Sequence, residues 1–131
     1  MRKLQSRDVI LNSINRNVVV IKPKAPLLEW VNSLPDDIGD IKLEGTRQDC
    51  TTYLIPEACY RDEAVKYIES IYREVFQIEL VSWRRDKSSW PKRRTLKMFN
   101  EWFEIEVHSL VIDVVDEYIE KEVYSWKEDL L

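Results

Sequence analysis

The sequence predicts a single α+β layered domain, in which two to four helices cover a sheet of about three strands. Three observations predict this fold class: two β-branched runs end at prolines, one apolar stripe recurs at helical spacing, and no internal repeat is visible. A chain of 131 residues fits one domain and can bury a core without a disulfide or a metal. We therefore treat residues 1–131 as one domain, with 1–16 and 116–131 as peripheral arms.

The predicted strands cover residues 17–22, 50–55 and 105–115. The first two (Asn-Val-Val-Val-Ile-Lys and Cys-Thr-Thr-Tyr-Leu-Ile) are rich in strand-forming residues, and a proline follows each of them. Residues 105–115 have a similar composition, so we expect the three strands to share one sheet. The gap between the first two strands permits a right-handed parallel crossover, but the pattern leaves the pairing order open.

The clearest predicted helix runs from Arg61 to Leu80, because its apolar residues form one stripe at a period near 3.6. An earlier helix begins around Pro26 and stops at Pro35, since proline is tolerated in the first turn but not in the interior. A third helix begins near Thr95 and carries Leu96, Phe99, Trp102 and Phe103 on one side.

Four stretches have weaker signals. Residues 1–16 are compatible with a short helix or a loose arm, and residues 36–40 (Asp-Asp-Ile-Gly-Asp) predict an acidic turn. Residues 41–49 fit either a strand start or a helical turn. The tail, 116–131, is compatible with a helix that carries Tyr118, Ile119, Val123 and Trp126.

Scarce residue types exclude several classes of site. Two glycines are too few for a phosphate-binding loop or a dinucleotide fingerprint. A single histidine excludes zinc sites that need two, and the two cysteines form no Cys-x-x-Cys motif. No cofactor or metal is therefore expected. No apolar run approaches the 20 or so residues of a membrane helix, so no membrane partner is expected either.

The charge is strongly segregated although the net charge is only −4. Residues 84–94, which we name the basic connector, carry six basic residues against Asp86, whereas residues 101–131 carry ten acidic residues against two lysines. Arginines beside an aromatic ring suit nucleic acid, because guanidinium groups bind phosphate and a ring can stack on a base. This predicts a binding site made of Arg84, Arg85, Trp90, Lys92, Arg93 and Arg94. The alternative is that Trp90 anchors a solvated loop that pairs with the acidic tail.

His108 and Cys59 are the two candidates for chemistry. Imidazole titrates near neutrality and suits a general base, although a lone histidine in a strand is more often structural. Cys59 precedes the long predicted helix, whose N-terminal dipole would activate a thiolate. The aromatic residues Trp83, Trp90, Phe99, Trp102 and Phe103 fit a core better than a ligand cage.

Three segments carry a resemblance: Asn-Arg-Asn-Val-Val-Val-Ile-Lys-Pro-Lys (15–24), Cys-Thr-Thr-Tyr-Leu-Ile-Pro-Glu (50–57), and residues 90–109, beginning Trp-Pro-Lys-Arg-Arg. Over about residues 15–115 the chain resembles a family of small uncharacterised bacterial proteins with no assigned activity. The resemblance implies a bacterial, cytoplasmic setting and transfers no site residue.

These observations favour a cytoplasmic, non-enzymatic protein-interaction or regulatory module that binds a protein partner or a second copy of itself. The missing catalytic motifs and the separated charges support this hypothesis. Nucleic-acid binding through the basic connector is the first alternative. A small enzyme that uses His108 or Cys59 is the second.

Overall fold

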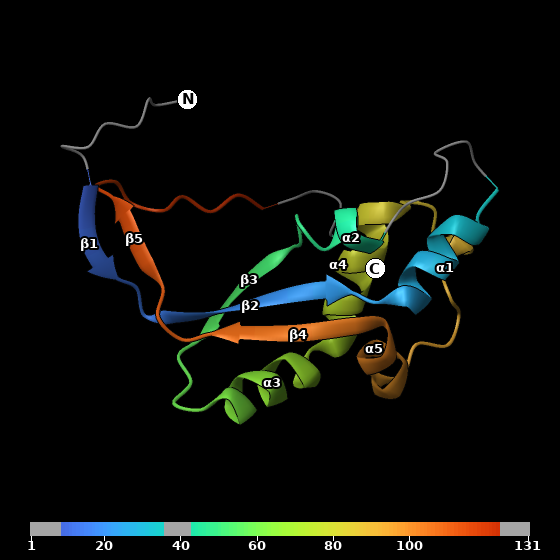
Figure 1. Cartoon of the computed structure of the whole chain (residues 1–131), viewed down its shortest axis with the longest axis horizontal. Coiled ribbons are helices and arrows are strands. Elements are labelled where there is room, and N and C mark those ends of the chain that lie inside the picture. Colours follow the sequence, from blue (N-terminus) through green and yellow to red (C-terminus); the bar gives the residue numbers. More distant parts are fainter. Residues whose placement is uncertain (1–8, 36–42, 124–131) are drawn as a thin grey trace.

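The computed structural model describes residues 9–35 and 43–123, which form a three-stranded sheet, a two-stranded ribbon and five α-helices (Figure 1). The sheet has the order β3-β2-β4, with β3 (Thr52–Pro56), β2 (Arg16–Pro23) and β4 (Phe103–His108). The α+β fold class is therefore confirmed. Both pairings are antiparallel, so the parallel crossover that the long gap permitted does not occur.

The central strand β2 shows why one face of the sheet is buried. Its residues alternate strictly between partly exposed and buried, and Asn17, Val19, Ile21 and Pro23 point toward the helices. The facing residues of β4 continue the same surface, since Ile21 lies opposite Ile105 and Pro23 opposite Phe103. Because side chains alternate across a strand, the other face carries Lys22 and its polar neighbours.

The five described helices are α1 (Ala25–Ser33), α2 (Leu43–Thr46), α3 (Arg61–Ser70), α4 (Tyr72–Trp83) and α5 (Leu96–Trp102), with a short 3-10 turn, η2 (Lys87–Ser89), between the last two. Four of them, α1, α3, α4 and α5, contribute residues to the core on the buried face (Figure 1). The predictions of a helix over 26–34 and of a helix start at Thr95 are confirmed. Thr95 is the N-cap of α5, and its hydroxyl accepts a hydrogen bond from the backbone N–H of Met98 at 3.1 Å.

The predicted single helix over 61–80 is wrong in one respect, because it is two helices divided at Ile71. This residue has φ −118° and ψ 24°, and its N–H bonds to the carbonyl of Ile68 at 3.0 Å. No proline or glycine marks the break in the sequence. Tertiary packing accounts for it, since α3 lies against β4 whereas α4 lies against α5.

The predicted strand over 105–115 is also wrong in its extent, because β4 ends at His108 and β5 (Ile112–Val115) belongs to the ribbon with β1 (Val9–Ser13). Val18 pairs with His108 in the sheet and Ser13 pairs with Ile112 in the ribbon, and the residues between them pair in neither the β2–β4 nor the β1–β5 ladder. The ribbon also has a register irregularity between Val9 and Asn12, and irregularities of this kind bend and twist a strand pair. The β1–β5 ribbon projects away from the helices (Figure 1).

The arms differ from expectation. Residues 9–13 form strand β1 rather than a helix or a loose arm, and residues 116–123 contain no helix. Residues 41–49 contain the helical turn α2, which was one of the two alternatives. The predicted acidic turn at 36–40 and residues 124–131 of the predicted tail helix lie outside the described residues.

Aromatic side chains fill the centre of the core, as predicted. Phe76 is fully buried, and its ring centroid lies 5.9 Å from that of Phe99, 5.6 Å from Trp102 and 5.4 Å from Phe103. Such tilted and edge-to-face pairs are the preferred aromatic arrangements. Trp90 is buried in the same cluster, and Trp83 packs against it.

Candidate functional site

The basic connector is an ordered turn at the end of the molecule beside α1 (Figure 1). Asp86 caps η2, and its carboxylate accepts hydrogen bonds from the N–H of Ser88 at 3.0 Å and from the Ser88 hydroxyl at 2.7 Å. These two bonds hold the pKa of Asp86 below its ordinary value. The connector therefore presents its cations from a defined backbone.

Tryptophans anchor the connector to the core. Trp90 is 5% exposed, and its indole N–H donates to the carbonyl of Arg84 at 2.8 Å. Trp30 of α1 donates its indole N–H to the carbonyl of Ser89 at 3.0 Å. The Trp90 ring is thus enclosed, with the Arg94 guanidinium 5.7 Å from its centroid, and it offers no open face to a base. In the structure, Trp90 therefore anchors the loop to the core.

The six predicted connector residues do lie together, but they differ in exposure. Arg85, Lys92 and Arg93 are exposed to solvent. Arg84 and Arg94 are half-buried and donate to the carbonyls of Trp83 and Pro91, each at 2.7 Å. With Lys87, which is also exposed, the connector therefore presents four exposed cations to a partner.

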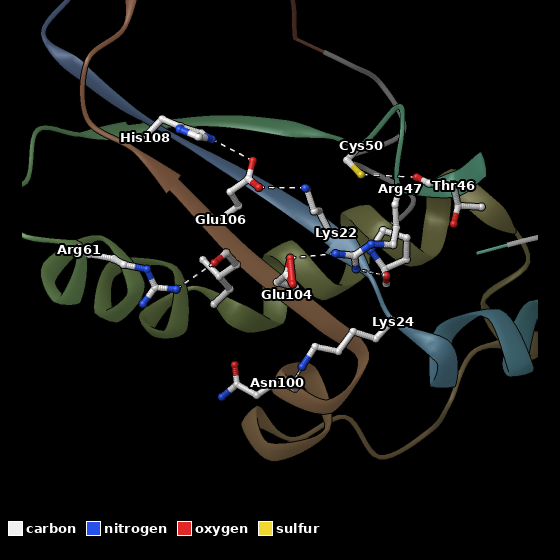
Figure 2. A network of polar contacts seen from close by, with 12 residues as sticks. Lys22, Lys24, Thr46, Arg47, Cys50, Arg61, Asn100, Glu104, Glu106 and His108 are labelled. Atoms are coloured by element: carbon white, nitrogen blue, oxygen red, sulfur yellow. Dashed lines mark hydrogen bonds and ion pairs between the residues drawn. The ribbon is translucent and has the colours of Figure 1, made fainter. Parts of the chain in front are cut away.

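His108 lies on the open face of the sheet, in the network that Figure 2 shows. Its Nε2 is 2.9 Å from Oε2 of Glu106, whose other oxygen is 2.9 Å from Nζ of Lys22. The hydrogen bond to Glu106 raises the pKa of Lys22, and the same bond lowers the pKa of Glu106. Beside them, Arg47 binds Glu104 at 2.9 Å. The sequence analysis missed Lys22 and Arg47, although the alternation of Glu104, Glu106 and His108 is a signal for a polar face.

Cys59 is exposed in the turn before α3, and both cysteines are free thiols. Within the described residues, His108 has Glu106 as its side-chain partner, and the described hydrogen bonds include none between His108 and Cys59. Neither residue lines a described cavity. Among the described residues, the geometry therefore pairs His108 with a carboxylate and does not join it to Cys59.

A buried carboxylic acid, which sequence analysis missed, lies in a cavity of about 220 Å³ between β2, α4 and the loop before β3. Glu79 is 5% exposed and accepts a hydrogen bond of 2.6 Å from the Tyr53 hydroxyl. Burial raises the pKa of Glu79 to about 7, although the Tyr53 hydroxyl acts in the opposite direction. The position of Glu79 in the sequence could have predicted this burial, because residues 75, 76, 79 and 80 share one face of a helix.

The last surface is the acidic–apolar arm, which we define as residues 109–123. Six of the nine large hydrophobic side chains that are exposed within the described residues belong to it: Leu110, Ile112, Val114, Tyr118, Ile119 and Val123. Five acidic residues and one lysine lie among them, for a net charge of −4. Between the β1–β5 ribbon and Tyr118 lies a hollow of about 500 Å³.

Comparison with protein-family models, curated proteins and solved structures found no match. Across residues 9–35 and 43–123, no helix has the length and apolar character needed to cross a bilayer. The same residues contain no cluster of three or more histidine, cysteine or acidic side chains suited to a metal ion.

Proposed function

We propose that this protein is a small non-enzymatic protein-interaction module and that the acidic–apolar arm is its binding surface. The observation that carries the proposal is the concentration of exposed apolar side chains in this segment: Tyr118 is 98% exposed and Leu110 is 70% exposed. Exposed apolar side chains that cluster in this way usually mark a protein interface. The ribbon also has outer strand edges, and an extended partner segment can pair with such an edge.

The chemistry of the arm indicates the kind of partner. Its hollow is lined by apolar groups of Ile14, Tyr118 and Ile119 and by the carboxylates of Asp113 and Asp116. A lysine or arginine side chain suits this lining, because its apolar stem can lie on the floor while its charged end meets a carboxylate. The partner we propose is therefore a basic, partly apolar protein segment.

We further propose a cytoplasmic role in a bacterium. Two free thiols are typical of a reducing compartment, and the bacterial origin follows from the resemblance of the segments described above.

A synthetic peptide with alternating lysine and valine tests the binding surface directly. We expect it to bind the full chain with an affinity that falls as salt rises, and to lose at least tenfold in affinity for Leu110→Ser/Tyr118→Ser. The matched control is Leu54→Ser/Tyr67→Ser, which removes exposed apolar groups outside the arm. Absence of binding, or equal loss in both variants, would refute the proposal.

A further inference from the structure

The hollow beside the β1–β5 ribbon and the basic connector lie at opposite ends of the long axis of the molecule, whereas the rest of the acidic–apolar arm runs back from the ribbon along the molecule (Figure 1). Figure 1 shows the β1–β5 ribbon at one end and the connector between α4 and α5 at the other. The connector carries a net charge of +5 and the acidic–apolar arm a net charge of −4. The hollow, whose lining includes Asp113, Asp116 and Glu117, therefore cannot meet the connector of its own chain, although the two are complementary in charge.

The hollow and the connector are also complementary in polarity. The hollow of about 500 Å³ in the arm has apolar walls and acidic groups, and the connector presents Lys92 and Arg93 as long exposed cations. A cation of this length can bury its stem in such a hollow and keep its charge at the carboxylates. The connector thus has the side chains that the hollow requires.

A second, smaller hollow lies beside the connector on α4. It has a volume of about 180 Å³ and is lined by Ile78, Val81, Ser82 and Arg85. Its lining is mainly apolar with a cation among the lining residues, so it suits an apolar side chain that carries acidic neighbours. Tyr118, which follows Asp116 and Glu117 and is almost fully exposed, has these properties.

We propose that the partner of the acidic–apolar arm is the basic connector of a second copy of this chain, so that copies associate head to tail. This inference rests on the proposed function for the arm as a protein-binding surface. Pairing of two arms about a two-fold axis is disfavoured, because both carry negative charge. A head-to-tail contact is heterologous, so it produces either a closed ring or an open chain of copies.

Charge reversal on each surface tests the inference in the full-length protein. One variant is Lys92→Glu/Arg93→Glu in the connector, and the other is Asp116→Lys/Glu120→Lys in the arm; all four residues are exposed. By sedimentation velocity at low salt, the wild-type sedimentation coefficient should rise with concentration. Each variant alone should remain monomeric, and an equal mixture of the two should associate again, because opposite charges then face each other.

The association should disappear at about 1 M salt, at which the screening length is about 3 Å. Variants with the same changes in charge elsewhere, Lys66→Glu/Lys97→Glu and Glu57→Lys/Glu74→Lys, should associate like the wild type. A wild-type protein that stays monomeric at every concentration, or a mixture that does not recover association, overturns the inference. If the lysine–valine peptide still binds the arm in that case, the proposed function stands and only the identity of the partner is wrong. Binding of a single-stranded oligonucleotide to the connector of a monomeric protein would likewise overturn it.

Discussion

The buried carboxyl of Glu79 leads to the most quantitative prediction. Burial raises its pKa in the folded protein from an ordinary value of 4.5 to about 7. Between these two values the folded chain holds a proton that the unfolded chain has lost. The stabilisation that the extra proton on Glu79 gives to the folded protein is therefore fully present below about pH 4.5 and is lost as the pH rises toward 7. A shift of this size corresponds to about 3 kcal/mol of unfolding free energy.

Replacement of Glu79 by glutamine removes the titration and keeps an oxygen that can accept the Tyr53 hydroxyl hydrogen bond. We expect the variant to gain about 2.5 kcal/mol of unfolding free energy relative to the wild type when the pH rises from about 5 to about 8, since part of the effect has already developed at pH 5. Urea denaturation followed by tryptophan fluorescence measures both proteins at both values. Comparison at the same pH cancels the other titrating groups, which the two proteins share.

The control for this experiment is Glu74→Gln, which changes an exposed carboxylate on the same helix. The difference in unfolding free energy between Glu74→Gln and the wild type should stay constant over the same pH range. A Glu79→Gln difference that is equally constant would show that Glu79 does not hold a proton in the folded protein, and would refute the argument from burial.

Three further predictions concern the core, a helix cap and the cysteines. Phe76→Ala should lower the unfolding free energy by about 3–5 kcal/mol, because it empties the centre of the aromatic cluster; a loss below about 1 kcal/mol in urea denaturation would contradict the packing. Thr95→Ala should cost about 1 kcal/mol, since the N–H of Met98 loses its cap, and Thr95→Ser should restore most of it in the same assay. Iodoacetamide should alkylate exposed Cys59 faster than Cys50, because burial raises the pKa of the Cys50 thiol; peptide mass spectrometry over time checks this, and faster modification of Cys50 would contradict it.

Patterns of short range were predictable from the sequence. The strands at 17–22 and 50–55, the helix that starts at Pro26 and the cap at Thr95 each follow from residue type and from a proline or a capping residue close by. The role of Trp90 does not follow from its neighbours in the sequence. The same Trp-Pro-Lys-Arg-Arg sequence suits a stacking platform or a loop anchor, and the indole hydrogen bond to Arg84 distinguishes them only after the chain has folded.

The candidate interaction surface was also predictable only in part. Sequence analysis identified the negative charge of the tail and the positive charge of the connector. The gathering of six exposed apolar side chains in one arm was not predictable, because residues 105–115 have strand composition throughout and nothing in them marks the end of β4 at His108. The burial of Glu79 was not predicted either, because an acidic residue in a charged chain is expected in solvent and its hydrogen-bond partner Tyr53 lies on the distant strand β3.

The sequence by itself determined the α+β class, most of the strand and helix positions and the separation of charge, because each depends on residues close together in the chain. Tertiary structure alone decided the break at Ile71, the division of β4 from β5, the burial of Glu79 and the placement of the hollow and the basic connector at opposite ends. The physical reason is that these features arise from packing between segments distant in sequence, and packing can override local preference without leaving a local signal.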